Sequence, residues 1–265
     1  MRVLPRSELE METAVSKKRF ALIAATILAA AAVAPAQAGS FTNGGFETNT
    51  ATSSGSKING DLAGWTNNDW YSNGVDKGPG YNFLYLSNPN NVYNTGLPLW
   101  GVIPPSPNGG NFVGMDGAYE QSPLSQTVTG LTAGALYYIS FYFGGAQQDG
   151  PSFTSATTDQ FAVDFTSGST APVSYTCTTT GVQCTRVLYD APKSFTGWNF
   201  AGFTFLATSS TETLSFLAIG TPAGQPPFSL LDGVSLQLPE PPSVLMLGGL
   251  GVLLAAARVR RKRAA

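Results

Sequence analysis

Apolar side chains recur at every second position in several short segments, and this period of two limits the fold more than any other feature. In residues 136–143 the odd-numbered positions carry tyrosine, isoleucine and phenylalanine, whereas the even-numbered ones include serine. The same alternation marks residues 160–165 and 201–205, and a short apolar run covers 214–219. Glycine, proline, asparagine or serine clusters bound each segment, and no long segment has a helical period. The pattern predicts an all-β fold, an antiparallel β-sandwich of short strands.

Residues 67–111 have a different composition, rich in asparagine, glycine and proline with aromatic residues among them. We expect long loops there, carrying one short strand near residues 82–86. Loops of this length are usually functional or poorly ordered, and sugars present C–H faces that pack on aromatic rings. Trp70, Tyr71 and Trp100 are therefore the candidate ligand-binding residues. Their expected polar neighbours are Asn67, Asn68, Asp69 and Asn73, whereas core positions are expected for Trp65 and Trp198.

Residues 39–238 are strongly acidic, with 12 acidic side chains against four basic ones, a difference of −8. The other basic residues lie outside this range, which hides the imbalance in the whole-chain charge of −2. Nucleic acid binding needs lysine and arginine against the phosphates, so no nucleic acid partner is expected. The balance suits divalent cations or neutral sugars.

Histidine is absent from all 265 residues. Ser-His-Asp and Cys-His catalysis are therefore excluded, together with His-ligated zinc and iron sites. Two acid pairs, Asp159 with Asp164 and Asp116 with Glu120, leave a glycoside hydrolase as the remaining enzyme class. Neither spacing is diagnostic, so we expect a protein that is not an enzyme.

The two cysteines, Cys177 and Cys184, are separated by six residues. In an exported chain the pattern indicates a local disulfide that closes a hairpin. A free thiol pair and a metal site are the alternatives, and the metal site lacks further soft ligands.

The beginning of the chain has the three parts of a secretory signal. Basic residues 17–19 precede an uncharged apolar run over 20–34, and Ala36-Gln37-Ala38 supplies small residues for signal peptidase. The run is shorter than the about 20 apolar residues that a transmembrane helix needs. We expect a signal peptide over 1–38, forming a helix in its apolar part, and a β-sandwich domain over 39–237.

The end of the chain, residues 238–265, changes composition abruptly. Pro239, Glu240 and Pro241 are followed by an uncharged apolar stretch, about 244–257, and then by a cluster of arginine and lysine. A helix of this length spans about 21 Å, which is less than the roughly 30 Å hydrocarbon core. Basic residues after an apolar stretch stay on the cytoplasmic side, so we expect a short transmembrane helix that anchors the chain only transiently.

This order of Pro-Glu-Pro, apolar helix and basic end resembles the PEP-CTERM sorting signal. The resemblance implies that an exosortase recognises Pro239, Glu240 and Pro241 in the inner membrane and removes the tail. It further implies an exported protein at the cell surface or in the extracellular matrix of a host that makes exopolysaccharide.

The mature region is similar to galactose-binding-like jelly rolls, the fold of many carbohydrate-binding modules. The similarity lies in Asn43–Glu47, Gly64-Trp65, Gly114–Gly117, residues 124–128 and Leu231–Leu236. One departure is Asp232-Gly233, where the family usually has Asp-Asp.

The jelly-roll resemblance implies a structural Ca²⁺ between the first and last strands, with Glu47 and Asp232 as carboxylate ligands. The alternative is that both are ordinary turn or surface carboxylates. It also implies a carbohydrate-binding module that acts in exopolysaccharide or biofilm. The alternative function is a structural matrix or adhesin protein with no dedicated ligand site.

Overall fold

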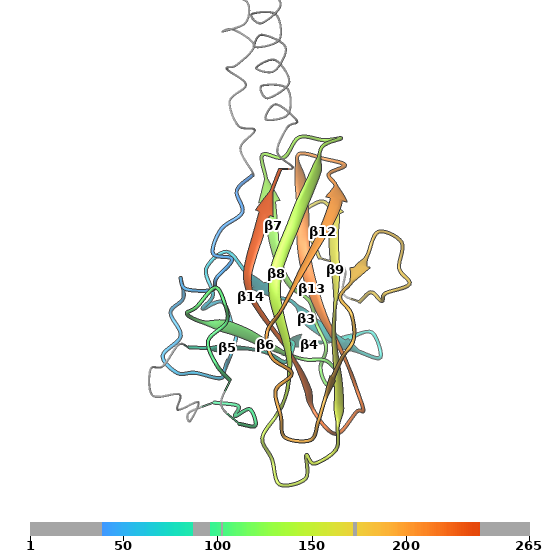
Figure 1. Cartoon of the computed structure of the whole chain (residues 1–265). Helices are drawn as coiled ribbons and strands as arrows, with labels where there is room; N and C mark the ends of the chain where they lie inside the picture. Colours follow the sequence, from blue (N-terminus) through green and yellow to red (C-terminus); the bar gives the residue numbers. More distant parts are fainter. Residues whose placement is uncertain (1–38, 87–95, 102, 172–173, 239–265) are drawn as a thin grey trace, which may run out of the picture. The chain divides into compact units, whose positions relative to one another are not determined.

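Two antiparallel β-sheets pack face to face in the part of the chain that the computed structural model describes, residues 39–86, 96–101, 103–171 and 174–238 (Figure 1). These residues form fourteen strands and no helix. The arrangement is an all-β, jelly-roll sandwich, which confirms the fold class that the period-two segments predict.

The first sheet has six strands, in the spatial order β1 (Ser56–Lys57), β5 (Asn82–Tyr85), β6 (Phe112–Asp116), β14 (Pro227–Gln237), β8 (Leu136–Gln147) and β12 (Asn199–Leu206). The second sheet runs in the order β10 (Gln183–Cys184), β9 (Thr157–Ser167), β13 (Thr211–Thr221), β7 (Leu124–Thr129) and β2 (Thr66–Asn67), and its β9 also pairs with β11 (Leu188–Asp190). A separate hairpin joins β3 (Asp69–Ser72) to β4 (Val75–Pro79). The last two long strands, β13 and β14, thus lie in the middle of their sheets, each between strands from earlier in the chain.

The core fills the space between the two sheets. Residues at alternate positions of β8, among them Ile139 and Phe141, are fully buried because they face the second sheet. Phe216 of β13 meets them from the other side, with ring centroids 5.0 Å from Phe141 and 6.1 Å from Phe161. Trp65 packs against the same cluster, 6.2 Å from Phe216, as expected for a core tryptophan.

The four segments that show a period of two, or a short apolar run, fall within β8, β9, β12 and β13, so those strand predictions are confirmed. Apolar residues stand at consecutive positions over residues 216–219 because both faces of β13 are covered. Phe216 faces the core, and Leu217 on the opposite face packs against Tyr175.

The prediction of a single strand within residues 67–111 was wrong. Beside β5, this stretch holds the hairpin of β3 and β4 and the end of β2. The turn of the hairpin is Asn73-Gly74, with φ angles of 54° and 74°, the left-handed pair that a two-residue type I′ turn requires. Its strands are mostly exposed or half-buried, so they carry no apolar alternation.

Neither end of the chain lies within the described residues. The expected signal peptide over 1–38 lies outside them, as do Pro239, Glu240 and Pro241 and the apolar stretch over 244–257. Among the residues that are described, the structure contains no helix with the length and apolar character of a membrane span.

Candidate functional site

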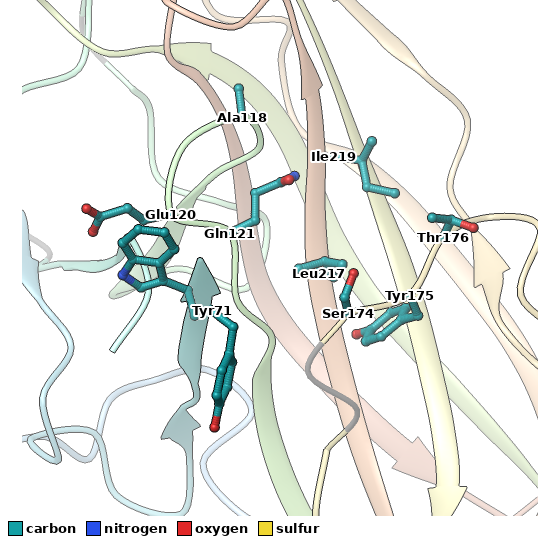
Figure 2. Close-up of a pocket in the computed structure, with 10 residues that line it drawn as sticks. Tyr71, Ala118, Glu120, Gln121, Ser174, Tyr175, Thr176, Leu217 and Ile219 are labelled. Atoms are coloured by element: carbon teal, nitrogen blue, oxygen red, sulfur yellow. The ribbon is translucent and has the colours of Figure 1, made fainter. Parts of the chain in front are cut away.

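A groove lies on the outer face of the second sheet, between the β3–β4 hairpin and the segment that precedes the disulfide. Its volume is about 370 Å³. In Figure 2, Tyr71 and Glu120 stand on one side, Tyr175 and Thr176 on the other, and Gln121 and Leu217 between them. The lining residues are Trp70, Tyr71, Ala118, Glu120, Gln121, Ser174, Tyr175, Thr176, Leu217 and Ile219.

The floor of the groove is held rigidly by the sheet beneath it. Leu217 and Ile219 stand two residues apart on β13, so both point away from the core that Phe216 enters. The side-chain amide of Gln121 donates to the carbonyl of Ala218 at 2.8 Å and also to that of Gly117. These bonds fix the amide plane of Gln121 next to an apolar surface.

The first wall comes from the hairpin and brings two of the predicted ligand-binding residues together. Trp70 and Tyr71 are consecutive on β3, and both line the groove. The Tyr71 side chain is 48% exposed, which leaves its ring accessible to a ligand. Glu120 lines the same side and pairs with Lys57, with 3.7 Å between Oε2 and Nζ. The tight Asn73-Gly74 turn pairs β3 with β4 and so positions the aromatic side chains of Trp70 and Tyr71.

The second wall is built around Tyr175. Its ring packs on Ala162 and Leu217, and its hydroxyl donates to Ser215 Oγ at 3.1 Å. Burial raises the pKa of the Tyr175 hydroxyl well above its usual range, so the group stays neutral. Tyr175 was not predicted from the sequence, because it lies in a loop far along the chain from Trp70 and Tyr71.

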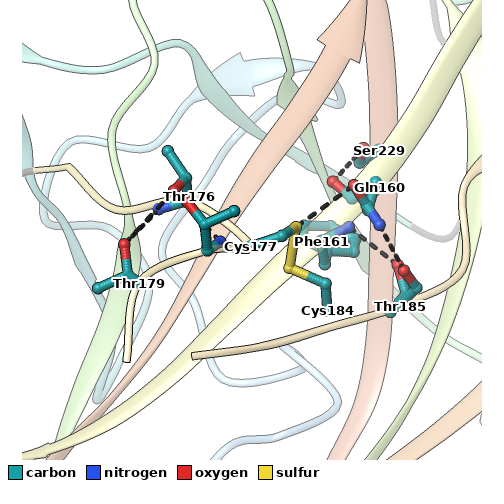
Figure 3. Close-up of a disulfide and its surroundings, with 9 residues drawn as sticks. Gln160, Phe161, Thr176, Cys177, Thr179, Cys184, Thr185 and Ser229 are labelled. Carbon is teal, nitrogen blue, oxygen red and sulfur yellow. Dashed lines mark hydrogen bonds between the residues drawn. A yellow bond between two sulfur atoms is a disulfide. The ribbon is translucent and has the colours of Figure 1, made fainter. Parts of the chain in front are cut away.

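A disulfide joins Cys177, the residue that follows the second wall in the chain, to Cys184, which confirms the predicted pairing (Figure 3). Cys184 belongs to β10, which pairs with β9, whereas Cys177 follows the wall residues 174–176. The bridge therefore closes a loop onto the second sheet rather than a two-stranded hairpin. It ties the wall to the sheet that forms the groove floor.

Removing the disulfide is expected to lower stability modestly. The loop between the cysteines is short, so the double variant Cys177→Ser/Cys184→Ser should lose about 2 kcal/mol of unfolding free energy. Urea unfolding of the full chain measures the loss, and a reducing agent should reproduce it in the unchanged chain but not in the variant. A variant as stable as the oxidised parent would show that the loop is held by packing alone.

A second cavity of about 360 Å³ shares the lining residue Ala118 with the groove. Tyr81 and Tyr119 form an edge-on aromatic pair in it, with ring centroids 5.1 Å apart. Burial raises the pKa of Asp116 to about 6, while hydrogen bonds from the backbone N–H groups of Ala118 and Tyr119 oppose the rise. Residues 116–121 thus contribute to the lining of both cavities.

The third aromatic candidate, Trp100, does not line the groove with Trp70 and Tyr71. Its ring lies under Lys193, with Nζ 4.3 Å from the ring centroid, in a cation–π contact. Trp198, expected in the core, is half-buried and donates from Nε1 to the carbonyl of Pro104 at 2.9 Å.

The expected polar neighbours have mainly structural roles. Asn67 is buried and donates to the carbonyls of Ile58 and Gly80, while Asn68 donates to that of Pro123 at 2.7 Å. Asn73 forms the hairpin turn. The polar groups that do line the groove, such as Gln121 and Thr176, come from other segments.

Glu47 and Asp232, the expected calcium ligands, do lie close to each other. Asp232 is fully buried at the bulge in β14. The next residue, Gly233, has a φ of 60°, a backbone conformation that favours glycine. This conformation accounts for a glycine where the family usually has a second aspartate. Burial raises the pKa of Asp232 to about 7, and the nearby Glu47 carboxylate adds to the rise. Hydrogen bonds to its carboxylate from Ser106 and from the N–H of Gly233 oppose it.

The donor chemistry of this place fits Ca²⁺. Two carboxylates and the hydroxyl of Ser106 gather there, and such oxygen groups are the ligands that calcium prefers. The amide of Asn108 turns its NH₂ group toward Asp232 Oδ1. Among the described residues no three His, Cys, Asp or Glu side chains come together as metal ligands. A calcium ion at Glu47 and Asp232 would therefore complete its coordination with neutral oxygens.

Of the two acid pairs considered for a glycoside hydrolase, Asp159 with Asp164 does not form one site, whereas Asp116 and Glu120 are close enough for the charge of Glu120 to raise the pKa of Asp116. Asp159 and Asp164 are five residues apart on β9, so they point to opposite faces of the second sheet. Asp159 faces the core, where Ser229 bonds it, and Asp164 faces the outside. Two carboxylates on opposite faces of a sheet do not flank a common glycosidic bond.

The sequence matches no known family and no curated protein. Among solved structures, TmCBM61 in complex with beta-1,4-galactotriose is 14% identical over 77% of this chain and 100% of that chain, with a TM-score of 0.38. The K2 cleaved adhesin domain of Lys-gingipain is 13% identical over 74% of this chain and 96% of that chain, with a TM-score of 0.38. The structure named Family 16 Carbohydrate Binding Module-2 is 13% identical over 53% and 86%, with a TM-score of 0.25. Likenesses at this level identify neither a ligand nor site residues.

Proposed function

We propose that the groove between Tyr71 and Tyr175 binds a saccharide. The observation that carries the proposal is the pairing of an accessible aromatic wall, Trp70 and Tyr71, with a floor that joins apolar Leu217 to the fixed amide of Gln121. A sugar ring has an apolar C–H face and a rim of hydroxyls, and such a site offers a surface for each.

The charge of the region points to a neutral saccharide. Residues 39–238 carry an excess of eight acidic groups, and Glu120 stands in the groove itself. An anionic polysaccharide would meet like charge along this surface, which costs affinity. Neutral hydroxyls, in contrast, can donate to the Glu120 carboxylate and accept from the hydroxyl of Ser174 or Thr176.

Binding without hydrolysis fits the groove better than catalysis. Of its lining residues only Glu120 carries a carboxylate, whereas glycoside hydrolysis generally uses two that flank the bond. The protein would then hold a polysaccharide rather than cleave it.

We further propose that this domain acts outside the cell. The basic-apolar-small pattern of residues 1–38 supports export, and Pro239-Glu240-Pro241 with its apolar and basic continuation supports recognition by an exosortase. The domain would pass through the inner membrane, lose its tail and remain at the surface or in the extracellular matrix, where it would bind exopolysaccharide.

The sorting proposal predicts an all-or-none effect at one residue. In the natural host, Glu240→Ala should stop removal of the tail, because the change destroys the acidic centre of the recognised motif. Cell fractionation and immunoblotting should then show a longer chain confined to the inner membrane. The neighbouring Ser243→Ala variant is the control and should be processed normally. Normal processing of Glu240→Ala would refute recognition through this motif.

Affinity electrophoresis of the full chain through gels containing neutral or acidic polysaccharides tests saccharide binding. We expect retardation by at least one neutral polysaccharide and none by acidic ones. Free migration in every gel would contradict the proposal and favour the alternative of a structural matrix or adhesin protein.

A further inference from the structure

A second group of buried oxygen atoms lies between the two sheets, on the face of β9 opposite to the groove. Thr157 and Asp159 are two residues apart on β9 and therefore share a face. Asp190 of β11 stands directly opposite Thr157 in the strand register. The three side chains thus converge, and each is at most 3% exposed.

Neighbouring side chains confirm that this group faces the first sheet. Ser229 of β14 donates to Asp159 Oδ1 at 3.3 Å, and Ser194 donates to Asp190 Oδ1 at 2.5 Å. Gly145 of β8 makes room for the carboxylate, because a Cβ at that position would stand 2.8 Å from Asp159 Oδ2.

One oxygen of each converging side chain has no hydrogen-bond partner. These buried atoms are Asp159 Oδ2, Asp190 Oδ2 and Thr157 Oγ1. The two carboxyl groups are close enough for the charge of Asp190 to act on Asp159, yet no hydrogen bond joins them. Three orphaned oxygens in one place are unusual, since buried polar groups almost always find a partner.

The surroundings supply no positive charge to this pair. In the part of the chain that the structure describes, the one ion pair joins Lys57 to Glu120. Lys193 is three residues from Asp190 in the sequence, but its Nζ lies over the ring of Trp100. An ionised carboxylate that is buried without a counter-charge is strongly unfavourable.

Two kinds of partner could neutralise the pair, protons or a cation. Burial raises the pKa of Asp159 well above its usual range and that of Asp190 to about 6. Protonation removes the charge but leaves Thr157 Oγ1 unpartnered and gives no bond between the two carboxyl groups. A cation bound by the three orphaned oxygens would give each of them a partner and would neutralise the two carboxylates.

We propose that Thr157, Asp159 and Asp190 bind a hard divalent cation between the two sheets. All the donors are oxygens, the ligands that Ca²⁺ and Mg²⁺ take in proteins. The hydroxyls of Ser229 and Ser194, each bonded to one of the carboxylates, are the next oxygens available. The ion would tie β11 to β9 and to the first sheet, at a place distinct from Glu47 and Asp232.

Ion titration of the metal-stripped full chain tests the site. Isothermal titration with Ca²⁺ and, separately, with Mg²⁺ gives the number of bound ions and their Kd values. Asp159→Asn should bind one ion fewer than the unchanged chain, and Thr157→Val should weaken binding of that ion at least tenfold. Asp164→Asn, on the opposite face of the same strand, is the control and should change neither value.

The stability of Thr157→Val separates a cation site from an empty acidic pocket. If the site binds a cation, Thr157→Val should lose part of the rise in Tm that added Ca²⁺ or Mg²⁺ causes. If the site is an empty acidic pocket, valine merely replaces an unpartnered hydroxyl in the core, so Tm should rise and ion binding should not change. That second result, or an unchanged number of ions in Asp159→Asn, would overturn the proposal. If Asp159→Asn folds neither in the absence of divalent cations nor with Ca²⁺ or Mg²⁺ added, the near-isosteric Thr157→Val variant decides alone.

Discussion

Replacing Phe216 with alanine is expected to lower the free energy of unfolding by about 3–5 kcal/mol. The Phe216 ring is fully buried and contacts Trp65, Phe141 and Phe161, so it links the two sheets and the residue that precedes β2. Alanine leaves a cavity that these rigid rings cannot fill by small movements. Urea unfolding of the full chain measures the loss.

Phe200→Ala provides the matched control for this substitution. Phe200 lies on the edge strand β12, is 58% exposed, and has its ring beside that of Tyr142. Its truncation should cost less than about 1 kcal/mol. Equal losses in the two variants would mean that the space between the sheets is not the stabilising core.

Calcium is expected to raise the thermal stability of the full chain through Glu47 and Asp232. An ion that binds only the folded state adds about 2.7 kcal/mol at one hundred times its Kd. Scanning calorimetry in EGTA and in excess Ca²⁺ should therefore give clearly separate Tm values. Asp232→Asn removes the buried carboxylate at the centre of the site, so the separation should shrink.

The exposed carboxylate of Asp76 on β4 supplies the control for calcium. Asp76→Asn changes the net charge by the same amount, and its calcium-induced rise in Tm should match that of the unchanged chain. A rise of full size in Asp232→Asn would contradict calcium binding at Glu47 and Asp232.

The sandwich could be predicted because its long strands are buried on one face and alternate accordingly. Residues 136–143 show this most clearly, with Ile139 and Phe141 inside and Tyr142 half-buried outside. Pairing between strands could not be predicted in the same way. β14 pairs with both β6 and β8, and no local pattern states which distant strands will meet.

The hairpin of β3 and β4 was missed although its turn was visible. Asn73-Gly74 is a strong sign of a two-residue hairpin. The flanking residues, however, lie on a hairpin outside the two main sheets, and the Tyr71 side chain is half exposed. Where neither face of a strand is fully buried, the apolar period that marks strands is absent.

The groove could be predicted only in part, because four segments that are distant in the sequence form it. Trp70 and Tyr71 stand out in the sequence as aromatics among polar residues. Tyr175 is placed beside them by the disulfide loop, and Leu217 by the central position of β13 in its sheet. Trp100 has the same sequence character as Trp70 but packs under Lys193.

The most direct test of the proposed saccharide site compares two tyrosines in one titration experiment. Tyr71 lines the groove, whereas Tyr189 on β11 is 81% exposed and does not line it. A neutral polysaccharide that retards the full chain is titrated into Tyr71→Ala and Tyr189→Ala. Loss of an aromatic hot spot costs about 2 kcal/mol, which corresponds to roughly a thirtyfold weaker Kd. We predict this loss for Tyr71→Ala and an unchanged Kd for Tyr189→Ala. Equal affinity in the two variants would contradict saccharide binding in the groove.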